Sequence, residues 1–247
     1  MPGLDAVQTL APEPETKRSA FTLPVLAAGP RPAGSDRLSD VASQLRPVAK
    51  RALDILGAGL LLFAAMPVFL VIAALVRLDG GPVFYAHERI GRGGRSFGCL
   101  KFRSMVPDAD RRLAALLERD PFARAEWDAT RKLKNDPRIT WVGRFLRASS
   151  LDELPQLLNV LKGEMSLVGP RPVQANELAA FYGAAAQHYM SVRPGITGAW
   201  QVSGRNDTSY AQRVALDVAY ASNPSLLTDL GILLRTPAAV LARRGAY

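Results

Sequence analysis

A run of 22 residues without a charged side chain, Ile55–Val76, constrains this chain more than any other part of its sequence. As one helix the run would extend ~33 Å, which is about the hydrocarbon thickness of a bilayer. The core helix of a soluble protein rarely runs this long without a charge. The sequence therefore predicts a segment that enters a membrane.

Pro67 leaves the topology of this segment open. Its ring clashes with the carbonyl of Phe63, so the helix should kink near its middle, into pieces of ~18 and ~14 Å. Either a kinked helix spans the bilayer, or the segment is re-entrant and returns to the same face. Basic residues favour the cytoplasmic side, and they lie beside both ends of the segment, so we expect re-entry. These residues are Lys50, Arg51, Arg77 and Arg89.

The remaining chain divides around this segment. Residues 1–47 hold seven of the 18 prolines and show no sustained periodicity, which predicts a flexible leader without a secretory signal. The re-entrant membrane helix is expected at 48–78, and one further domain at 79–247. We predict an α+β, mostly helical fold that combines the Pro-kinked membrane helix, a small β-hairpin and amphipathic interfacial helices.

Three segments of the domain carry structural signals. The stretch "PVFYAHERIGRGGRSFGCLKFRSM" predicts two strands joined at Gly91–Gly94, and a hairpin turn is favoured over a phosphate loop because no Gly-Lys-Ser/Thr follows. Residues 108–134 have the composition of a helix. The tail from Tyr210 predicts two amphipathic helices, broken at Asn223-Pro224 and at Thr236-Pro237, which either pack into the core or lie in the membrane interface.

The net charge of +9 is concentrated in residues 77–150, which hold 16 Lys and Arg against nine Asp and Glu. Such a local field attracts nucleic acid, anionic lipid or a phosphorylated small substrate. The single cysteine, Cys99, excludes an internal disulfide. His87 and His188 have no partner at metal-ligand spacing, which argues against a zinc site.

Asp152 and Glu153 stand side by side in "SSLDELPQ". Ser150 and Glu153 match the spacing of a capping box, in which the acids would only cap a helix. That helix would make Pro155 its fifth residue, where the proline ring meets the carbonyl of Leu151. We therefore expect the helix to begin at Pro155, with both acids just ahead of its positive end.

Arginines surround the acid pair in the sequence. Arg171 lies between two prolines that fix its backbone, and guanidinium groups suit bidentate phosphate binding. A carboxylate pair with such arginines predicts a phosphoryl-transfer site, where one acid attacks phosphorus and the other holds a divalent cation. The other arginines nearby in the sequence are Arg138, Arg144, Arg147, Arg193 and Arg205.

Five stretches between residue 50 and the C-terminus resemble a known family. They are "KRALDILGAG", "GPVFYAHERIG", "LKFRSM", "DPRITWVGRFLRASSLDELPQLLNVLKGEMSLVGPRP" and "RPGITGAWQVSGR". In these stretches the chain resembles the bacterial sugar transferases, the monotopic phosphoglycosyl transferases that load a phosphosugar onto polyprenyl phosphate. Its tail is similar to that of members that initiate exopolysaccharide synthesis with a hexose 1-phosphate.

This resemblance implies an enzyme of the bacterial inner membrane whose domain lies on the cytoplasmic face. Its substrates would be a UDP-hexose, such as UDP-glucose or UDP-galactose, and undecaprenyl phosphate, and its cofactor would be Mg²⁺. The resemblance implies that Asp152 forms an aspartyl phosphosugar with release of UMP and that Glu153 binds Mg²⁺. It also implies phosphate contacts from Arg147 and Arg171. The implied nucleotide-sugar contacts are Arg193, Thr197, Gln201 and Arg205.

Two other functions remain as alternatives. One is a membrane-anchored basic adaptor that binds anionic lipid or nucleic acid, although the middle third has no aromatic platform for nucleic acid. The other is an aspartyl-phosphate hydrolase, in which water takes the phosphoryl group. We expect no nucleic acid partner, and the sequence leaves self-association open.

Overall fold

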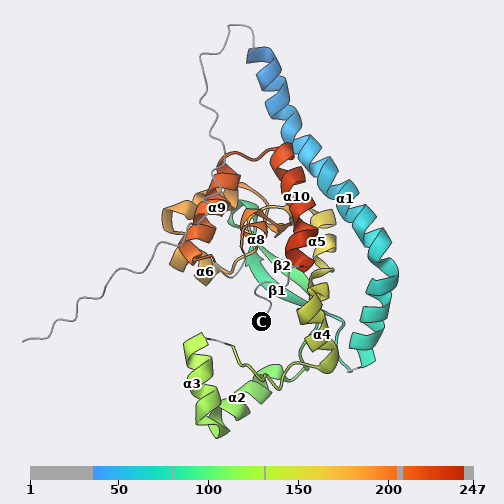
Figure 1. The fold of residues 1–247 in the computed structure, drawn as a ribbon, viewed down its shortest axis with the longest axis vertical. Helices are drawn as coiled ribbons and strands as arrows, with labels where there is room; N and C mark the ends of the chain where they lie inside the picture. Colours follow the sequence, from blue (N-terminus) through green and yellow to red (C-terminus); the bar gives the residue numbers. More distant parts are fainter. Residues whose placement is uncertain (1–35, 79, 131, 205–207, 242–247) are drawn as a thin grey trace, which may run out of the picture. The chain divides into compact units, whose positions relative to one another are not determined.

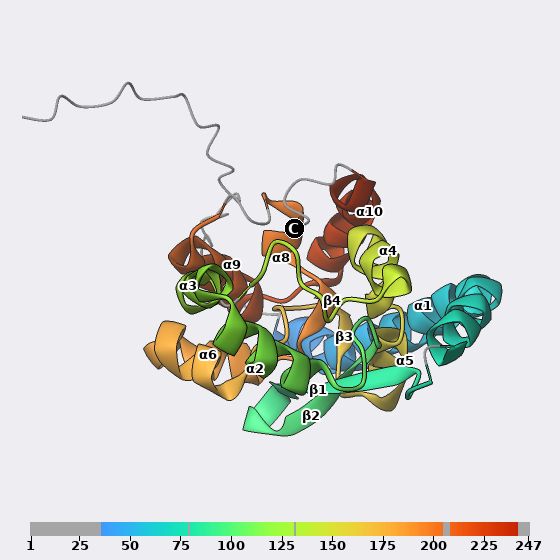
Figure 2. The same ribbon diagram turned by 90° about the horizontal axis from the view of Figure 1, so that it is seen from below.

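The computed structural model describes residues 36–78, 80–130, 132–204 and 208–241. Its contacts divide the chain into two units, Met1–Asp40 and Val41–Tyr247, and the account below concerns the second. Most of the predicted leader, residues 1–35, lies outside the described residues, and its remaining part from Asp36 is helical. The second unit is mostly helical with two small sheets, as Figures 1 and 2 show.

Helix α1 (Asp36–Leu78) contains the apolar run and continues through Pro47 and Pro67. Its part from Leu45 to Leu78 is long and apolar enough to cross a membrane, and only 11% of its most apolar 18-residue window is buried. Phe63 and Leu56 are 79% and 72% exposed. A buried core helix does not expose its large apolar side chains in this way, so α1 has the surface of a membrane helix.

Polar contacts attach the start of the apolar run to the domain. The Lys50 ammonium lies 3.2 Å from Asp54 Oδ1 and 3.1 Å from Asp229 Oδ2, on helix α10 (Leu226–Leu241). Asp54 also accepts hydrogen bonds from the Ser166 hydroxyl and the Leu167 amide. These contacts fix α1 beside α10 and strand β3 (Ser166–Val168).

The predicted hairpin is confirmed. Strands β1 (Phe84–Ile90) and β2 (Ser96–Phe102) pair antiparallel, with His87 opposite Cys99. A 3₁₀ turn, η1 (Arg92–Gly94), joins them, and Gly93 and Gly94 both have positive φ, which glycine adopts without strain. The buried side chain of Asn159 on helix α5 (Gln156–Lys162) bonds to the backbone of Gly98 and Leu100, which fixes the hairpin against α5.

A second sheet was not predicted. Strand β3 pairs in parallel with β4 (Gly195–Thr197), and both strands come from stretches that the sequence marked only as motifs. The backbones of Gly169 and Gly195 lie so close that a Cβ on Gly195 would overlap the Gly169 amide. Glycine is therefore required at this crossing. The loop that carries Arg171 follows β3 directly.

The remaining helices largely follow the expected segments. Residues 108–134 form two helices separated at Asp120, and the tail forms two helices separated at Asn223-Pro224. The remaining elements are α2 (Ala109–Arg119), α3 (Pro121–Thr130), α4 (Trp141–Ser149), η2 (Leu151–Glu153), α6 (Ala175–Phe181), η3 (Gly183–Ala185), α7 (Ala186–Ser191), α8 (Ala199–Val202) and α9 (Tyr210–Ser222).

The predicted break at Thr236-Pro237 is wrong, because α10 continues through Pro237 to Leu241. Proline withdraws one amide donor, but the Thr236 hydroxyl donates to the Ile232 carbonyl at 2.8 Å and adds a hydrogen bond within the same turn. One face of α10 buries Asp229 and Ile232, while Leu234 on another face is 81% exposed. The helix therefore packs into the domain and also presents an apolar surface outward.

Gly143 on α4 provides a test of this packing. A Cβ at this position would overlap the backbone carbonyl of Ser104, so the helix or the loop would have to shift its backbone. Gly143→Ala should therefore destabilise the protein by about 3 kcal/mol, measured as a lower thermal midpoint in detergent. The control is Gly231→Ala in α10, where nothing lies within 4 Å, and a gain of about 1 kcal/mol is expected. Equal midpoints for the two variants would contradict the close contact of α4 with this loop.

Candidate functional site

The acid pair lies in a 3₁₀ turn between two helices. Helix α4 ends at Ser149, Ser150 follows it with a left-handed φ of 59°, and η2 then carries Asp152 and Glu153. Ser150 makes no capping bond through its side chain, so the capping box is absent. Helix α5 begins at Gln156, one residue after the predicted start, with Pro155 as its N-cap, and both acids precede its first turn as expected.

Lys101 on β2 lies against both acids. Its ammonium is 2.6 Å from Glu153 Oε1 and 3.6 Å from Asp152 Oδ2. Sequence reasoning marked "LKFRSM" as a motif but gave this lysine no role. A lysine near the end of a largely apolar strand could have indicated a functional role. Its partners could not be identified, because they lie about 50 positions further along the chain.

Burial shapes the electrostatics of Asp152, which is only 9% exposed. Loss of solvent raises the pKa of the Asp152 carboxyl above its ordinary value, while the charges of Lys101 and Arg147 lower it. Burial also lowers the pKa of Lys101, but the two carboxylates outweigh this effect and raise it. A poorly solvated carboxylate beside fixed cations is suited to nucleophilic attack on an anionic centre.

Two of the predicted arginines act on the charges of this site. Arg147 Nε donates to the Ser104 hydroxyl at 2.8 Å, and its charge acts on the pKa of Asp152. Arg171 is exposed, lies over the Trp200 ring, and its charge acts on the pKa of Lys101. Lys101 therefore contacts both acids directly, whereas Arg147 and Arg171 act through their charges, Arg147 on Asp152 and Arg171 on Lys101.

The other predicted residues have different surroundings. Arg138 is buried and pairs with Asp136 at 2.7 Å. Arg193 donates to the Gly163 carbonyl, and the buried Thr197 hydroxyl lies 2.9 Å from that of Thr236. Gln201 is partly buried, and Arg205 lies outside the described residues. Within the described ranges, no hydrogen bond links Arg193, Thr197 or Gln201 to the acid pair.

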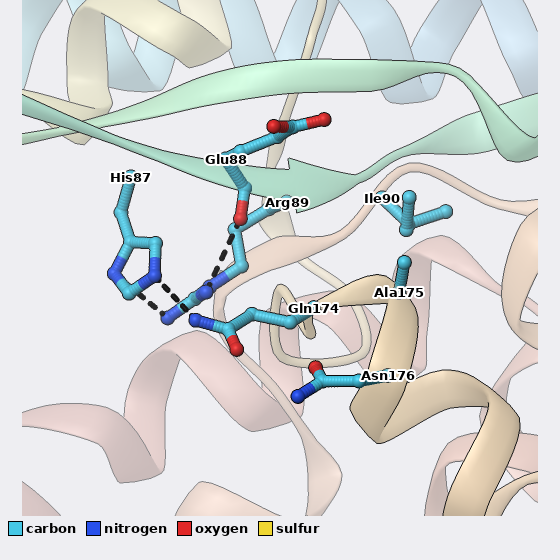
Figure 3. Close-up of a pocket in the computed structure, with 7 residues that line it drawn as sticks. All are labelled: His87, Glu88, Arg89, Ile90, Gln174, Ala175 and Asn176. Carbon is cyan, nitrogen blue, oxygen red and sulfur yellow. Dashed lines mark hydrogen bonds between the residues drawn. The ribbon is translucent and has the colours of Figure 1, made fainter.

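Two pockets adjoin the hairpin. One of ≈ 400 Å³ lies between β1 and the start of α6, and Figure 3 shows its lining side chains. The other, of ≈ 410 Å³, lies at the hairpin turn, and four cationic side chains are among its lining residues. These cations are Arg92, Arg95, Lys162 and Arg193.

Asp152 and Glu153 are the candidate ligands for the implied Mg²⁺. Across the described parts of the chain, no three His, Cys, Asp or Glu side chains gather as a metal site. Mg²⁺, however, is usually held by one or two carboxylates together with substrate phosphates and water. The adjacent carboxylates of Asp152 and Glu153 fit that manner of binding, with substrate oxygens completing the ligand set.

Comparison with known proteins places the chain in a family. The family model for bacterial sugar transferases matches residues 45–243. The exopolysaccharide production protein ExoY of Sinorhizobium fredii is 50% identical over 230 residues, which cover 93% of this chain and 96% of the relative.

Two further relatives have names that state a reaction. The undecaprenyl-phosphate galactose phosphotransferase of Salmonella typhimurium is 52% identical over 80% of this chain and 41% of its own length. The UDP-glucose:undecaprenyl-phosphate glucose-1-phosphate transferase of Caulobacter vibrioides is 41% identical over 88% of this chain and 77% of its own. The expectation of a transferase enzyme is confirmed: the chain belongs to the bacterial sugar transferase family.

Proposed function

We propose that this protein transfers a hexose 1-phosphate from a UDP-sugar to undecaprenyl phosphate and releases UMP, as the first membrane step of exopolysaccharide synthesis. The relatives whose names give a substrate act on galactose or glucose and on undecaprenyl phosphate. The observation that carries the proposal is the poorly solvated Asp152 carboxylate, set beside Glu153 and within reach of the Lys101 ammonium. Neither the relatives nor the site favours a non-catalytic adaptor.

The first step forms a bond between Asp152 and the donor. A carboxylate oxygen of Asp152 attacks the β-phosphorus of the UDP-sugar, and the bond from that phosphorus to the bridging oxygen breaks. UMP leaves with the electron pair, and the sugar phosphate remains on Asp152. Because UMP is a good leaving group, this step needs no general acid, in agreement with a site that holds cations around two carboxylates.

The second step releases the sugar phosphate to lipid. A phosphate oxygen of the prenyl phosphate attacks the same phosphorus, and the bond to Asp152 breaks. The carboxylate is regenerated, and the product is a lipid with a diphosphate-linked sugar. Both steps bring anions together, so Lys101, Arg147 and Arg171 serve to offset the repulsion. When bound to Asp152 and Glu153, Mg²⁺ would add positive charge at the diphosphate oxygens.

The membrane arrangement that suits this reaction is a re-entrant α1. At its start Arg51 donates to the carbonyls of Val160 and Leu161, and at its end the Val76 carbonyl accepts from buried Arg103. Both ends of the apolar run are therefore held by polar groups of one domain. Because one domain holds both ends of the run, our proposal puts the domain and both ends of α1 on one face of the membrane, the cytoplasmic one.

The proposed intermediate can be isolated. Wild-type protein given a UDP-hexose without lipid, then denatured, should carry a hexose phosphate on the peptide that contains Asp152, as measured by mass spectrometry. Asp152→Asn should lose both the adduct and UMP release, with turnover lower by about 10⁴-fold or more, because the attacking oxygen is gone. Asp110→Asn on α2 removes an exposed acid and should change neither. An active Asp152→Asn protein would exclude the covalent mechanism.

Lys101 gives a test through pH. Its charge lowers the pKa of Asp152, so its removal in Lys101→Gln should raise that pKa further. The acidic limb of kcat/KM, where activity is lost as Asp152 takes up a proton, should therefore move to higher pH, and turnover should fall by about 10²-fold. Lys101→Arg retains the charge and should keep the limb near its wild-type position. A limb that stays in place in Lys101→Gln would disprove this role.

The topology can be tested by labelling of cysteines. The native Cys99 is buried, and burial raises the pKa of its thiol to about 11, so it should not react. With a re-entrant α1, Ser19→Cys and Ala129→Cys should both resist an impermeant maleimide in intact cells and react after permeabilisation. If Ser19→Cys alone reacts in intact cells, α1 spans the membrane.

A further inference from the structure

The pocket beside β1 lies on the same face of the hairpin as Lys101. His87 pairs with Cys99, and Tyr85 pairs with Lys101. Directly opposed residues of an antiparallel pair share a face, as do residues two apart on one strand. His87 and Arg89 therefore project on the Lys101 side, and His87 lies two residues, ~7 Å along the strands, from the register of Lys101.

Side chains of complementary polarity converge in this pocket. In Figure 3 the His87 ring, the Arg89 guanidinium and the Gln174 amide point toward one another, with the Asn176 amide beside them. Arg89 Nη2 lies 3.3 Å from His87 Nδ1, and the Gln174 amide nitrogen contacts His87 Nε2. The Glu88 side chain points away from this group. The pocket therefore presents two carboxamides and an imidazole near one cation.

The charges connect this pocket to the acid pair. Burial lowers the pKa of His87, and the charges of Arg89 and Lys101 lower it further, which favours the neutral ring. Its two nitrogens are in contact with the Arg89 guanidinium and the Gln174 amide. Burial also lowers the pKa of Arg89, and the charge of Arg171 contributes in the same direction. Lys101 and Arg89 thus project from one face of the hairpin, and the charge of Arg171 acts on both of them.

We propose that this pocket holds the nucleoside of the donor and that Gln174 and Asn176 recognise its base. The inference rests on the proposed function, in which the β-phosphorus lies at Asp152 and the diphosphate extends along the cations. A side-chain amide offers a donor and an acceptor side by side, which complements the imide edge of uracil, a ring N–H between two carbonyls. A pocket of ≈ 400 Å³ is within the range of small-molecule sites.

Two of the residues implied earlier by the resemblance, Thr197 and Arg193, are engaged elsewhere. Thr197 is buried, and its hydroxyl is paired with that of Thr236 on α10. Arg193 lines the separate pocket at the hairpin turn and bonds to the Gly163 carbonyl. The pocket of Gln174 and Asn176 instead opens on the face that carries Lys101.

The experiment measures UMP binding and donor kinetics in parallel. In Asn176→Ala and Gln174→Ala, the Kd for UMP and the KM for the UDP-sugar should rise by about 10-fold, with kcat and the KM for prenyl phosphate nearly unchanged. The preference for UMP over CMP should fall by a similar factor, which a merely structural defect would not cause. Glu88→Gln alters the same pocket on a side chain that points away, so it should bind UMP like the wild type.

The outcomes separate the pocket from the reaction. If wild-type protein binds UMP and both amide variants bind it equally well with unchanged preference, the pocket is not the nucleoside site, and the transfer reaction stands. If wild-type protein does not bind UMP, the pocket proposal fails whatever the activity assay gives. If it binds UMP through these amides but forms no adduct on Asp152, the pocket proposal stands and the proposed mechanism fails.

Discussion

The ion pairs of Lys50 hold the membrane helix to the domain. This ammonium is shared between Asp54 of its own helix and Asp229 of α10, and it also donates to the Val168 carbonyl at the end of β3. Tyr220 extends the network by donating to Asp229 at 2.7 Å. Both acids are almost fully buried, and a buried carboxylate that loses its partner is strongly unfavourable. These contacts fix β3 and the loop of Arg171 relative to α1. In the proposed arrangement, the depth of α1 in the membrane therefore sets the distance of the site from the bilayer.

The site itself depends on segments far apart in the sequence. Lys101 comes from a hairpin strand, the acids from a turn between α4 and α5, and Arg171 from the loop after a parallel strand pair. The Asn159 amide keeps β2 against α5 and so maintains the distance between Lys101 and the acids. The carboxylates and cations are thus positioned by backbone contacts before any substrate binds, which is the condition for electrostatic stabilisation of a transition state.

Local chemistry made much of the fold predictable, whereas contacts between distant segments did not follow from sequence. The glycines of the hairpin turn and the geometry at Pro155 act within a few residues, and both led to predictions that are correct to within one residue. The break at Pro237 was predicted from the same rule and is wrong, because an added Thr236 bond and tertiary packing keep the helix intact. The three-residue strands β3 and β4 are too short for a periodic signal. The partners of Lys101 and of Thr197 required the fold.

The position of Lys101 bears on the order in which the two substrates bind. On the proposed function, both the departing nucleotide and the arriving lipid phosphate need the Lys101 ammonium, which lies against the acids. Two dianionic groups at one ammonium would repel each other. On the proposed mechanism, occupancy therefore alternates: the nucleotide leaves before the lipid head group enters, and Asp152 carries the sugar phosphate in the interval.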